Sequence, residues 1–540
     1  MRIPTTLAAT LVVLLAAGSG GCAKRERPVD TGAKTQTLHF GNGSEPQDID
    51  PQTVTGVPEH HVIMSLFEGL VTEDPKTLEP VPGIADKWTI SDDGLVYTFH
   101  IREAARWSNG DPITAPDIVA SFKRMLTPTL AAEYAYMLYH VVGAKEFNTG
   151  ATTDFDQVGF KAPDDHTLVI TLKHRTPFLL SAMASHQSWW PVNVKSIAAV
   201  GDPYRRGTPW TRPGKLVGSG PFELKEWSPN QQIVVEKSPT YWDAANVRLN
   251  AIEFRTIDNS DSLERAFRAG QIHVSPGVPL SKIETYKRTQ PDVLHIDPAL
   301  AVYYYMFNVT RPPLSDVRVR RALALAISRE SIVRDVTQAG EAPAYGFVPP
   351  GINGFESKHP LEGTISEARA LLADAGFPDG KGFPRLTLLY NTSNSHRTIA
   401  EAIQQMWRTN LGIEVTLANE EWKVYLDTTT RHNYDIAAGV WAGDYLDPHT
   451  FLELFETGGG NNTTGWSNKR FDEMLAQSLK APNDTTRFAI YNEMQGIMTD
   501  ELPVMPIYYF SRLSLRDPMV KGYYPTVLDH HPLKYIHLEK

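Results

Sequence analysis

The sequence predicts an α/β fold divided among more than one domain, and three observations support this prediction. The chain has 540 residues, whereas a single hydrophobic core stops growing at roughly 250–300 residues. Its hydrophobic fraction of 41% is ordinary for a globular protein, so cores can form. In the second half, short apolar segments with strand periodicity alternate with amphipathic helical segments, which is typical of a parallel sheet covered by helices.

The N-terminus has the composition of an export signal. Arg2 supplies positive charge, residues 7–17 form an apolar run, and small residues occupy positions 19–21. The run is shorter than the roughly 20 apolar residues that cross a bilayer stably. No later segment has the composition of a membrane span. We therefore expect a protein that is exported and whose folded body is soluble.

Cys22 is the only cysteine of the chain, which excludes a disulfide within one molecule. Small residues followed by a cysteine resemble a bacterial lipoprotein signal, in which the cysteine is acylated and becomes the mature N-terminus. Ser19 departs from that pattern, because an aliphatic residue usually stands three positions before the cysteine. An ordinary secretory signal with an incidental cysteine is the alternative. We expect residues 1–22 to be a lipoprotein-type signal peptide and the polar residues 23–34 to be a flexible tether.

The first half of the folded chain has a mixed pattern. A β-hairpin is predicted where the turn residues 91–94 separate residues 88–90 from alternating apolar residues at 97, 99 and 101. A helix is expected at residues 116–125, with Thr114 as its N-cap.

A further helix is predicted at residues 262–269. Asp261 and Glu264 have the spacing of a capping box, and Gly270 is placed to end the helix. Residues 217–221 are glycine-rich but run into an alternating segment instead of a helix, so we interpret them as a turn.

The second half alternates more regularly. Thr364 and Glu367 predict a capped helix that ends at Gly376. After it the pattern predicts strands at 385–390, 413–417 and 435–441, and helices at 398–410 and 422–429.

A ligand site is expected where two of these strands end, because open α/β sheets bind ligands outside the carboxyl ends of their strands. One candidate loop is 391–396. The other places Asp444 between Trp441 and Tyr445, next to Gly443, which would let a ligand backbone come close. Such a carboxylate suits an ammonium group, and the aromatic faces add cation–π attraction. A solvated turn ahead of residues 447–448 is the alternative.

Several function classes are disfavoured. The net charge of −10, with both signs mixed along the chain, argues against nucleic acid as a partner. The motifs of serine hydrolases, zinc proteases and phosphate-binding loops are missing. The histidine pairs at 60–61 and 530–531 are poor chelates if extended, since neighbouring side chains point to opposite faces. No metal or cofactor is expected, although a hydrolase built on scattered carboxylates stays open with 62 acidic residues.

Several ordered segments resemble the solute-binding proteins of peptide ABC importers (bacterial solute-binding protein family 5), and in particular its oligopeptide-binding members. The match extends over nearly everything after the tether. The segments that carry it are residues 42–47, 56–59, 66–70, 82–86, 97–102, 107–110, 238–242, 303–305, 316–320, 343–346 and 389–393, together with Trp88.

The resemblance implies a two-lobed periplasmic-binding-protein-like fold with an extra inserted domain and a hinge. The expected boundaries are 35–67, 196–300 and 510–540 for lobe I, 68–195 for the inserted domain, and 301–509 for lobe II. The chain is expected to cross between the lobes near Ala301 and Phe510. Closure would bury the ligand. Such a receptor performs no covalent chemistry and delivers its ligand to a separate permease, whose ATPase carries the phosphate loop.

The resemblance also implies roles for individual residues. Asp444 matches an aspartate that pairs with the α-ammonium of a peptide. Trp441 and Tyr134 match aromatic residues that flank the peptide, and Tyr304 is expected to line the cleft beside the hinge. The matching positions for main-chain hydrogen bonds are Val57, Val440 and Ala442, and those near the far end of the ligand are Asn391 and His396.

This chain departs from the family pattern in three respects. Ala301 and Ala442 stand where some members carry a disulfide. The basic residues that hold the ligand carboxylate are replaced by Thr337, Thr429 and Ala438, for which Arg397, Lys423 or Arg431 could substitute. Met306 replaces an acidic pocket residue. We therefore expect short peptides of unspecified length as ligands.

The expected partners are short peptides, an ABC importer permease with its ATPase, and a membrane reached through a lipid anchor, with the protein itself a monomer. Other ligands of the same class of receptor are murein peptides, nickel chelates, haem or sugars. A secreted peptide hydrolase or a chaperone-like peptide holder is the alternative from another class.

Overall fold

The computed structural model describes residues 26–352 and 354–540. An 11-stranded sheet runs through the length of the molecule, in the order β15-β14-β16-β12-β17-β11-β1-β10-β9-β8, with β13 added beside β17. Its strands are β1 Thr37–Gly43, β8 Phe222–Ser228, β9 Gln232–Lys237, β10 Ala251–Thr256, β11 Val274–Ser275, β12 Leu294–Phe307, β13 Ala342–Pro343, β14 Leu386–Asn391, β15 Val415–Glu420, β16 Ile436–Ala442 and β17 Val504–Arg516.

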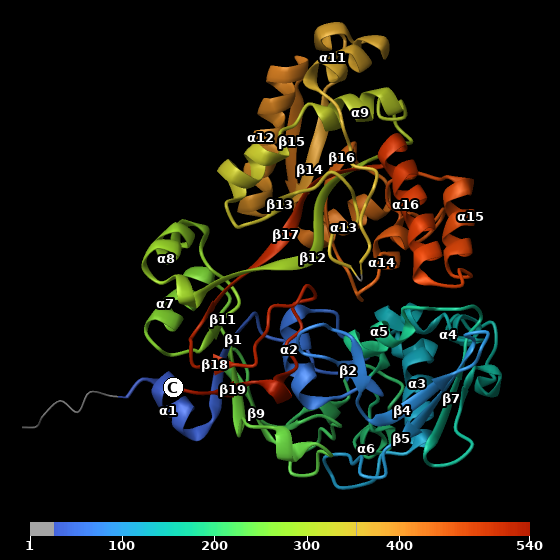
Figure 1. The fold of residues 1–540 in the computed structure, drawn as a ribbon, viewed down its shortest axis with the longest axis vertical. Helices are drawn as coiled ribbons and strands as arrows, with labels where there is room; N and C mark the ends of the chain where they lie inside the picture. The colour runs from blue at the N-terminus through green and yellow to red at the C-terminus, as the bar shows by residue number, and fades with distance from the viewer. Residues whose placement is uncertain (1–25, 353) are drawn as a thin grey trace, which may run out of the picture.

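The strands β12 and β17 join the two halves of the molecule (Figure 1). They pair antiparallel along most of their length, but the register shifts between Pro298 and Val302. The regular ladder is therefore interrupted at the level of Ala301, where the chain was expected to cross between lobes. A break of this kind in two otherwise continuous strands is where a hinge can bend with least loss of hydrogen bonding.

The upper half of the molecule in Figure 1 is the three-layer arrangement that the alternating pattern predicted. β14 pairs parallel with β15 and with β16. Successive residues of β12 point to opposite faces: Tyr303 belongs to one hydrophobic cluster and Tyr304 to the other. The first face is covered by α9 Val317–Leu325, α11 Ile365–Asp374 and α12 Asn394–Leu411. The second is covered by α13 Trp422–Thr430, α14 His449–Leu452, α15 Lys469–Ser478 and α16 Asp484–Glu501.

A separate four-stranded sheet forms most of the lower right of Figure 1. Its strands β4 Ala85–Ile90, β5 Val96–Ile101, β7 Thr167–Thr171 and β6 Phe160–Lys161 pair antiparallel, which confirms the predicted hairpin. Helix α3 Ala115–Leu126 packs on this sheet, and Thr114 caps it as predicted, with Asp117 completing a capping box that was not predicted. The core here comes from residues between Leu70 and Trp189, plus Tyr445 from the opposite lobe.

Lobe I has its own core. Alternate residues of β1, β10, β9 and β8 pack on helix α2 Val57–Leu66.

The other elements are short and distributed over the whole molecule. The remaining helices are α1 Pro28–Thr35, α4 Ala144–Asn148, α5 Leu179–Ser185, α6 Val194–Ala198, α7 Ser260–Arg268, α8 Ile283–Thr289 and α10 Arg329–Ser331, and the remaining strands are β2 Val71–Glu73, β3 Pro80–Pro82, β18 Val520–Lys521 and β19 His537–Leu538.

Two local predictions were wrong. The N-cap of α7 is Asn259, whose side chain accepts from the Ser262 amide, so Asp261 lies inside the helix instead of capping it. The tether prediction fails for residues 28–34, which lie in α1. Val29 there is buried, and its amide donates to Gly270 O at 3.1 Å, so the segment is fastened to lobe I. The signal peptide and Cys22 lie outside the described residues.

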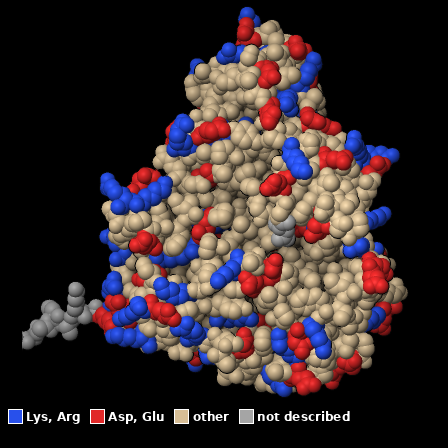
Figure 2. Space-filling model, in the orientation of Figure 1, with Lys and Arg blue, Asp and Glu red and all other residues tan. Residues whose placement is uncertain are grey.

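The distribution of charge on the surface and the character of the helices agree with what the composition of the sequence indicated. Acidic and basic side chains are interspersed over the face seen in Figure 2, without a continuous basic stripe. Across residues 26–352 and 354–540, no helix combines the length and apolar character needed to cross a membrane.

Candidate functional site

Two adjoining cavities lie along strand β16. Cavity A has a volume of about 400 Å³ and is lined by lobe I, the inserted domain and lobe II together. Cavity B has a volume of about 390 Å³ and belongs to lobe II. Val440 and Trp441 line both cavities, so the two form one continuous cleft along the strand.

The residues predicted to contact a ligand all line this cleft. Val57, Tyr134, Val440, Trp441, Ala442 and Asp444 line cavity A. Tyr304, Asn391 and His396 line cavity B, together with Val440 and Trp441. Segments nearly 400 residues apart in sequence are thus brought to one cleft, and whether they bind a ligand is taken up below.

Asp444 stands at the end of β16 with its carboxylate in cavity A. None of the described ion pairs includes Asp444. Burial raises the pKa of this carboxyl from 3.8 to about 7, because removal from water penalises the charged form. The alternative of a solvated turn is therefore wrong. A half-buried carboxylate without a cation is a strong acceptor for an ammonium group.

The backbone around Asp444 ties the two sides of the cleft together. The Ser185 hydroxyl of α5 donates to Asp444 O at 3.1 Å, and the Leu446 amide donates to Ser181 Oγ at 3.2 Å. The ring of Tyr445 stacks on Phe178 of the inserted domain at 4.6 Å between centroids. In this structure the lobes thus touch beside Asp444.

Gly443 has a packing role that the sequence did not predict. A Cβ at this position would lie 2.8 Å from the Leu300 side chain, so Leu300 of the same chain requires the glycine. The Gly443 amide also donates to Leu300 O at 2.8 Å. The glycine therefore fits the end of β16 against strand β12; it also lines cavity A, so its predicted role in the approach of a ligand backbone stays a prediction.

The edge of β16 that faces the cleft is open. β14 pairs with it only at Ile436 and Ala437, and the Tyr425 hydroxyl donates to the carbonyl of Ala438. Within the described part of the chain, no strand pairs with residues 439–442 on this side, whereas β12 pairs with all of β16 on the other. Val440 and Ala442 lie two residues apart, so their main-chain groups point the same way.

Aromatic residues enclose the cavity around this edge. The indole nitrogen of Trp441 is buried without a hydrogen-bond partner. Tyr134 packs edge-on against His186 with 4.3 Å between centroids. Tyr304 lies in cavity B beneath Gly439, where a Cβ would meet its ring at 2.6 Å. The walls can therefore cover apolar parts of a ligand, while the Trp441 N–H stays available as a donor.

The far end of the cleft has no cation among the residues described as lining it. The residues lining cavity B include Met306, Thr429 and Ala438 but no described lysine or arginine. Arg397 pairs with Glu401 and Arg431 with Asp427 outside the cavity, so neither fills the position of the missing basic residues. Thr337 is buried and donates to Glu341. The side chain of Lys423 lies outside the described set.

His396 is the sequence-predicted contact at this end of the cleft. Burial lowers the pKa of His396, so its ring is neutral at pH 7. Among the described residues that line cavity B, this end of the cleft therefore offers neutral polar groups and no formal positive charge.

Sequence reasoning missed a set of histidines at the floor of cavity A. His60, His186 and His530 line it; the rings of His60 and His530 are 4.8 Å apart. Burial lowers the pKa of His60 well below its usual value and that of His186 to about 3. Burial also opposes charging of His530, but the Glu73 carboxylate outweighs it and raises its pKa. The histidine pairs were visible in the sequence, but their meeting across lobe I was not.

The described residues contain no group of three or more histidine, cysteine or acidic side chains placed to hold a metal ion. Ala301 and Ala442, which the resemblance matches to a pair of cysteines, are directly opposite one another in the β12–β16 ladder. The two departures from the family pattern therefore lie at one place in the structure.

Comparisons with known proteins agree with this architecture. The family model described as "Bacterial extracellular solute-binding proteins, family 5 Middle" matches residues 79–463. The periplasmic oligopeptide-binding protein OppA of Escherichia coli (strain K12) is 37% identical over 526 residues, which cover 96% of this chain and 95% of that protein. The periplasmic murein peptide-binding protein MppA of the same organism is 36% identical over 499 residues, covering 91% of each.

Among solved structures, Haemophilus influenzae OppA in complex with RPPGFSPFR matches with a TM-score of 0.80 and 32% identity, covering 94% of this chain and 99% of that one. The predicted mixed α/β fold is confirmed by this likeness. The chain belongs to the bacterial extracellular solute-binding proteins of family 5.

Proposed function

We propose that this protein is the extracytoplasmic receptor of a peptide importer, which captures short peptides in a closing cleft and delivers them to an ABC transporter permease. The observation that carries the proposal is the unpaired carboxylate of Asp444 at the end of the open edge of β16. Together they offer an extended peptide an anion for its amino terminus and a row of backbone groups for its main chain.

This mode of binding is β-strand addition. Main-chain hydrogen bonds give affinity for any sequence, and cavities that take alternate side chains set the preferences. Cavities A and B continue along the same edge, so a peptide of a few residues fits their joint length. The names of the relatives, an oligopeptide-binding and a murein peptide-binding protein, support a peptide as the ligand.

Lipid attachment at Cys22 is part of the proposal. The small residues before Cys22 and its position as the sole cysteine support an acylated anchor that holds a monomeric receptor near its permease. One acyl chain alone binds a membrane only marginally, so the anchor is expected to carry more than one. A Cys22→Ser variant that still sediments with membranes would contradict this assignment.

The experiment that tests the function compares peptides and variants. Isothermal titration calorimetry with Ala-Ala-Ala should show saturable binding. N-acetyl-Ala-Ala-Ala should bind at least about 100-fold more weakly, since breaking a buried ion pair costs about 3–5 kcal/mol. Asp444→Asn should cause a similar loss for the free peptide. Asp92→Asn, in the exposed hairpin turn, is the matched control and should bind normally.

Mass spectrometry of the purified protein complements the titration. Intact short peptides of mixed sequence released by denaturation would support a receptor. Equal affinity for free and acetylated peptides would remove the role of Asp444, and cleavage of added peptides would contradict a non-enzymatic receptor.

A murein peptide is a second candidate ligand, because MppA matches nearly as well as OppA. It too carries an amino terminus that Asp444 could bind. Competition between a murein tripeptide and Ala-Ala-Ala for the same site would separate a dedicated murein receptor from a general one.

A further inference from the structure

A third cavity, cavity C, lies between the inserted domain and lobe II, beyond Asp444. Its volume is about 470 Å³, larger than cavities A and B. Tyr136 lines both cavity A and cavity C, and Tyr445, which lines cavity C, directly follows Asp444 in the chain. Cavity C therefore adjoins the place proposed for the ligand ammonium group beside Asp444.

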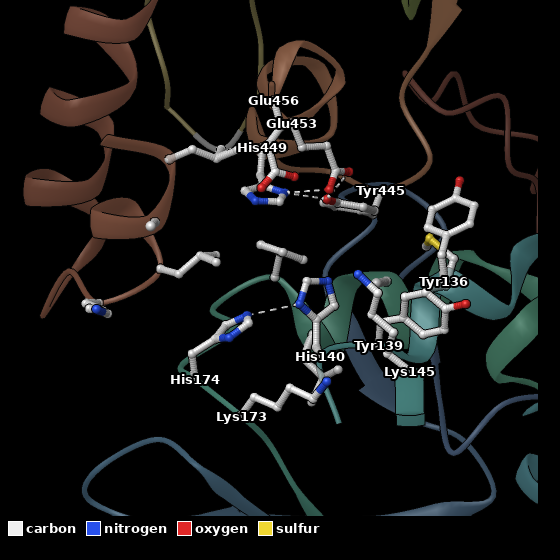
Figure 3. A pocket seen from close by; sticks show the side chains of 18 of the residues that line it. Tyr136, Tyr139, His140, Lys145, Lys173, His174, Tyr445, His449, Glu453 and Glu456 are labelled. Carbon is white, nitrogen blue, oxygen red and sulfur yellow. Dashed lines mark hydrogen bonds and ion pairs between the residues drawn. The ribbon is translucent and has the colours of Figure 1, made fainter. Parts of the chain in front are cut away.

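The wall that lobe II contributes to cavity C carries a carboxyl group without a cation. Glu453 accepts a hydrogen bond from the Tyr445 hydroxyl at 3.0 Å and lies 3.4 Å from His449 Nδ1. Burial lowers the pKa of His449 far below its usual value, so this imidazole is neutral and does not compensate the carboxylate. Figure 3 shows Glu453 and His449 together on one side of the cavity.

The state of Glu453 reflects this lack of a counter-charge. Burial raises its pKa from 4.5 to about 8; the Tyr445 hydroxyl opposes that rise, while Asp444 and Glu456 add to it. The charge of Asp444 therefore acts on Glu453 across the junction of cavities A and C. Two neighbouring carboxyl groups without cations form a site that a doubly positive group would stabilise better than a singly positive one.

The facing wall presents no permanent positive charge near Glu453. His140 and His174 of the inserted domain lie opposite (Figure 3), with 3.2 Å between His140 Nδ1 and His174 Nε2. Burial lowers the pKa of His140 to about 3 and also lowers that of His174. Both rings are therefore neutral at pH 7.

Three lysines also line cavity C, but they sit toward solvent. Lys173 pairs with Glu146 at 3.1 Å, and Lys145 and Lys480 are exposed. Charges in contact with water are strongly screened over a Debye length of about 8 Å at physiological salt. The part of cavity C beside Glu453 is therefore the part that attracts a cation.

We propose that cavity C receives the side chain of the ligand's first residue and that Glu453 selects a basic side chain there. This inference rests on the proposed function, because it takes the ligand amino terminus to lie at Asp444. A peptide that begins with lysine or arginine would then place one positive group on each carboxylate, and its binding at pH 7.5 would displace the proton that the raised pKa keeps on Glu453. The specificity so defined concerns the first residue alone, since Glu453 lies on the side of Asp444 away from cavity B.

The test compares Lys-Ala-Ala with norleucine-Ala-Ala, which has a similar side-chain length and no charge. Isothermal titration at pH 7.5 should show about tenfold tighter binding of the lysine peptide to the wild-type protein, equivalent to about 1.4 kcal/mol. Glu453→Gln keeps an acceptor for the Tyr445 hydroxyl and should remove most of that preference. Glu473→Gln, an exposed carboxylate on α15 away from the cavity, is the control and should retain it.

The outcomes separate the inference from the function on which it rests. Unchanged affinity of Glu453→Gln for the norleucine peptide would show that the variant is folded and that only the charge preference was lost, as proposed. If both peptides bind the wild-type protein equally, or if Glu453→Gln keeps the preference, the inference is overturned while the receptor function stands. If neither peptide binds the wild-type protein, both fail.

Discussion

Asp444 carries a free-energy cost when the cleft is empty, because its carboxylate is withdrawn from water without a cation. A carboxyl group whose pKa is raised on folding stabilises the protein below the unfolded pKa and loses that contribution as pH rises through the folded one. For Asp444 that range runs from 3.8 to about 7. Under the proposed function, ligand binding would remove this cost by supplying an ammonium group as the partner of the carboxylate.

Peptide affinity should therefore depend on pH. An ammonium group favours the carboxylate, so below pH 7 binding must displace a proton from Asp444. Affinity should fall by up to about tenfold per pH unit on the acid side. Above about pH 8 it should fall again as the peptide amine loses its proton. Peptide affinities measured from pH 5 to 9 would show both decreases. The Asp444→Asn variant should lose the decrease on the acid side, and a wild-type protein without that decrease would contradict the assignment.

The carboxyl terminus of the ligand should matter far less than the amino terminus. Cavity B offers His396 and Asn391 but no described lysine or arginine, and exposed or neutral contacts contribute about 1 kcal/mol or less. Ala-Ala-Ala-amide should bind within about fivefold of the free acid. A loss of 100-fold on amidation would mean that a cation reaches cavity B in the complex.

At the scale of residues, the sequence indicated Asp444 as a candidate acceptor for an amine, a role that stays a prediction, but it did not indicate the surroundings of this carboxylate. Asp444 could be found because a carboxylate after a strand end has a local pattern. The histidines of cavity A and Glu453 of cavity C could not be found in this way, because what distinguishes them is the lack of compensating charges around them. Such an absence is a property of packing across the lobes, which no local pattern contains.

At the scale of elements, strand β16 does two kinds of work. One edge pairs with β12 throughout, which fixes its place beside the hinge. Among the described residues, no strand pairs with its other edge beyond Ala437, so residues 439–442 could serve as a template for a further strand. Exposed strand edges are usually blocked because they recruit other chains; here the cleft walls limit what can reach the edge to a short segment.

Backbone substitution in the ligand tests this use of the edge. An ester that replaces the second peptide bond of Ala-Ala-Ala removes one N–H donor while keeping the shape of the chain. Loss of one such hydrogen bond is expected to cost about 0.5–1.5 kcal/mol, or roughly two- to tenfold in affinity. Side chains at that position should have smaller effects. Equal binding of the ester and the amide would argue that the ligand does not pair with β16.

Element prediction succeeded where the signal was local and failed where the packing decided. The N-cap at Thr114 and the capping box at Thr364 form as predicted, because a cap depends on residues three positions apart. Asp261 has the spacing of a capping box, but the helix is capped two residues earlier, at Asn259. The polar segment at 28–34 folds as α1 because lobe I buries Val29, a contact that its own composition does not reveal.

At the scale of the whole molecule, β12 and β17 unite two lobes that would otherwise be separate domains. Their shared sheet is interrupted near Ala301, and lobe II closes on the inserted domain through Tyr445 and Phe178. The sequence indicated an α/β body, but the two-lobed arrangement came from the resemblance to a family. The exact domain boundaries stay a prediction, since strands of the main sheet pass between the lobes without a linker.

A crystal structure of the protein with Ala-Ala-Ala tests the central claim most directly. We expect the peptide extended beside residues 439–442 of β16, enclosed by both lobes, with its ammonium nitrogen within about 3 Å of an Asp444 carboxylate oxygen, the distance of a charge-assisted hydrogen bond. A peptide bound elsewhere, or one whose amino terminus faces solvent away from Asp444, would contradict the account.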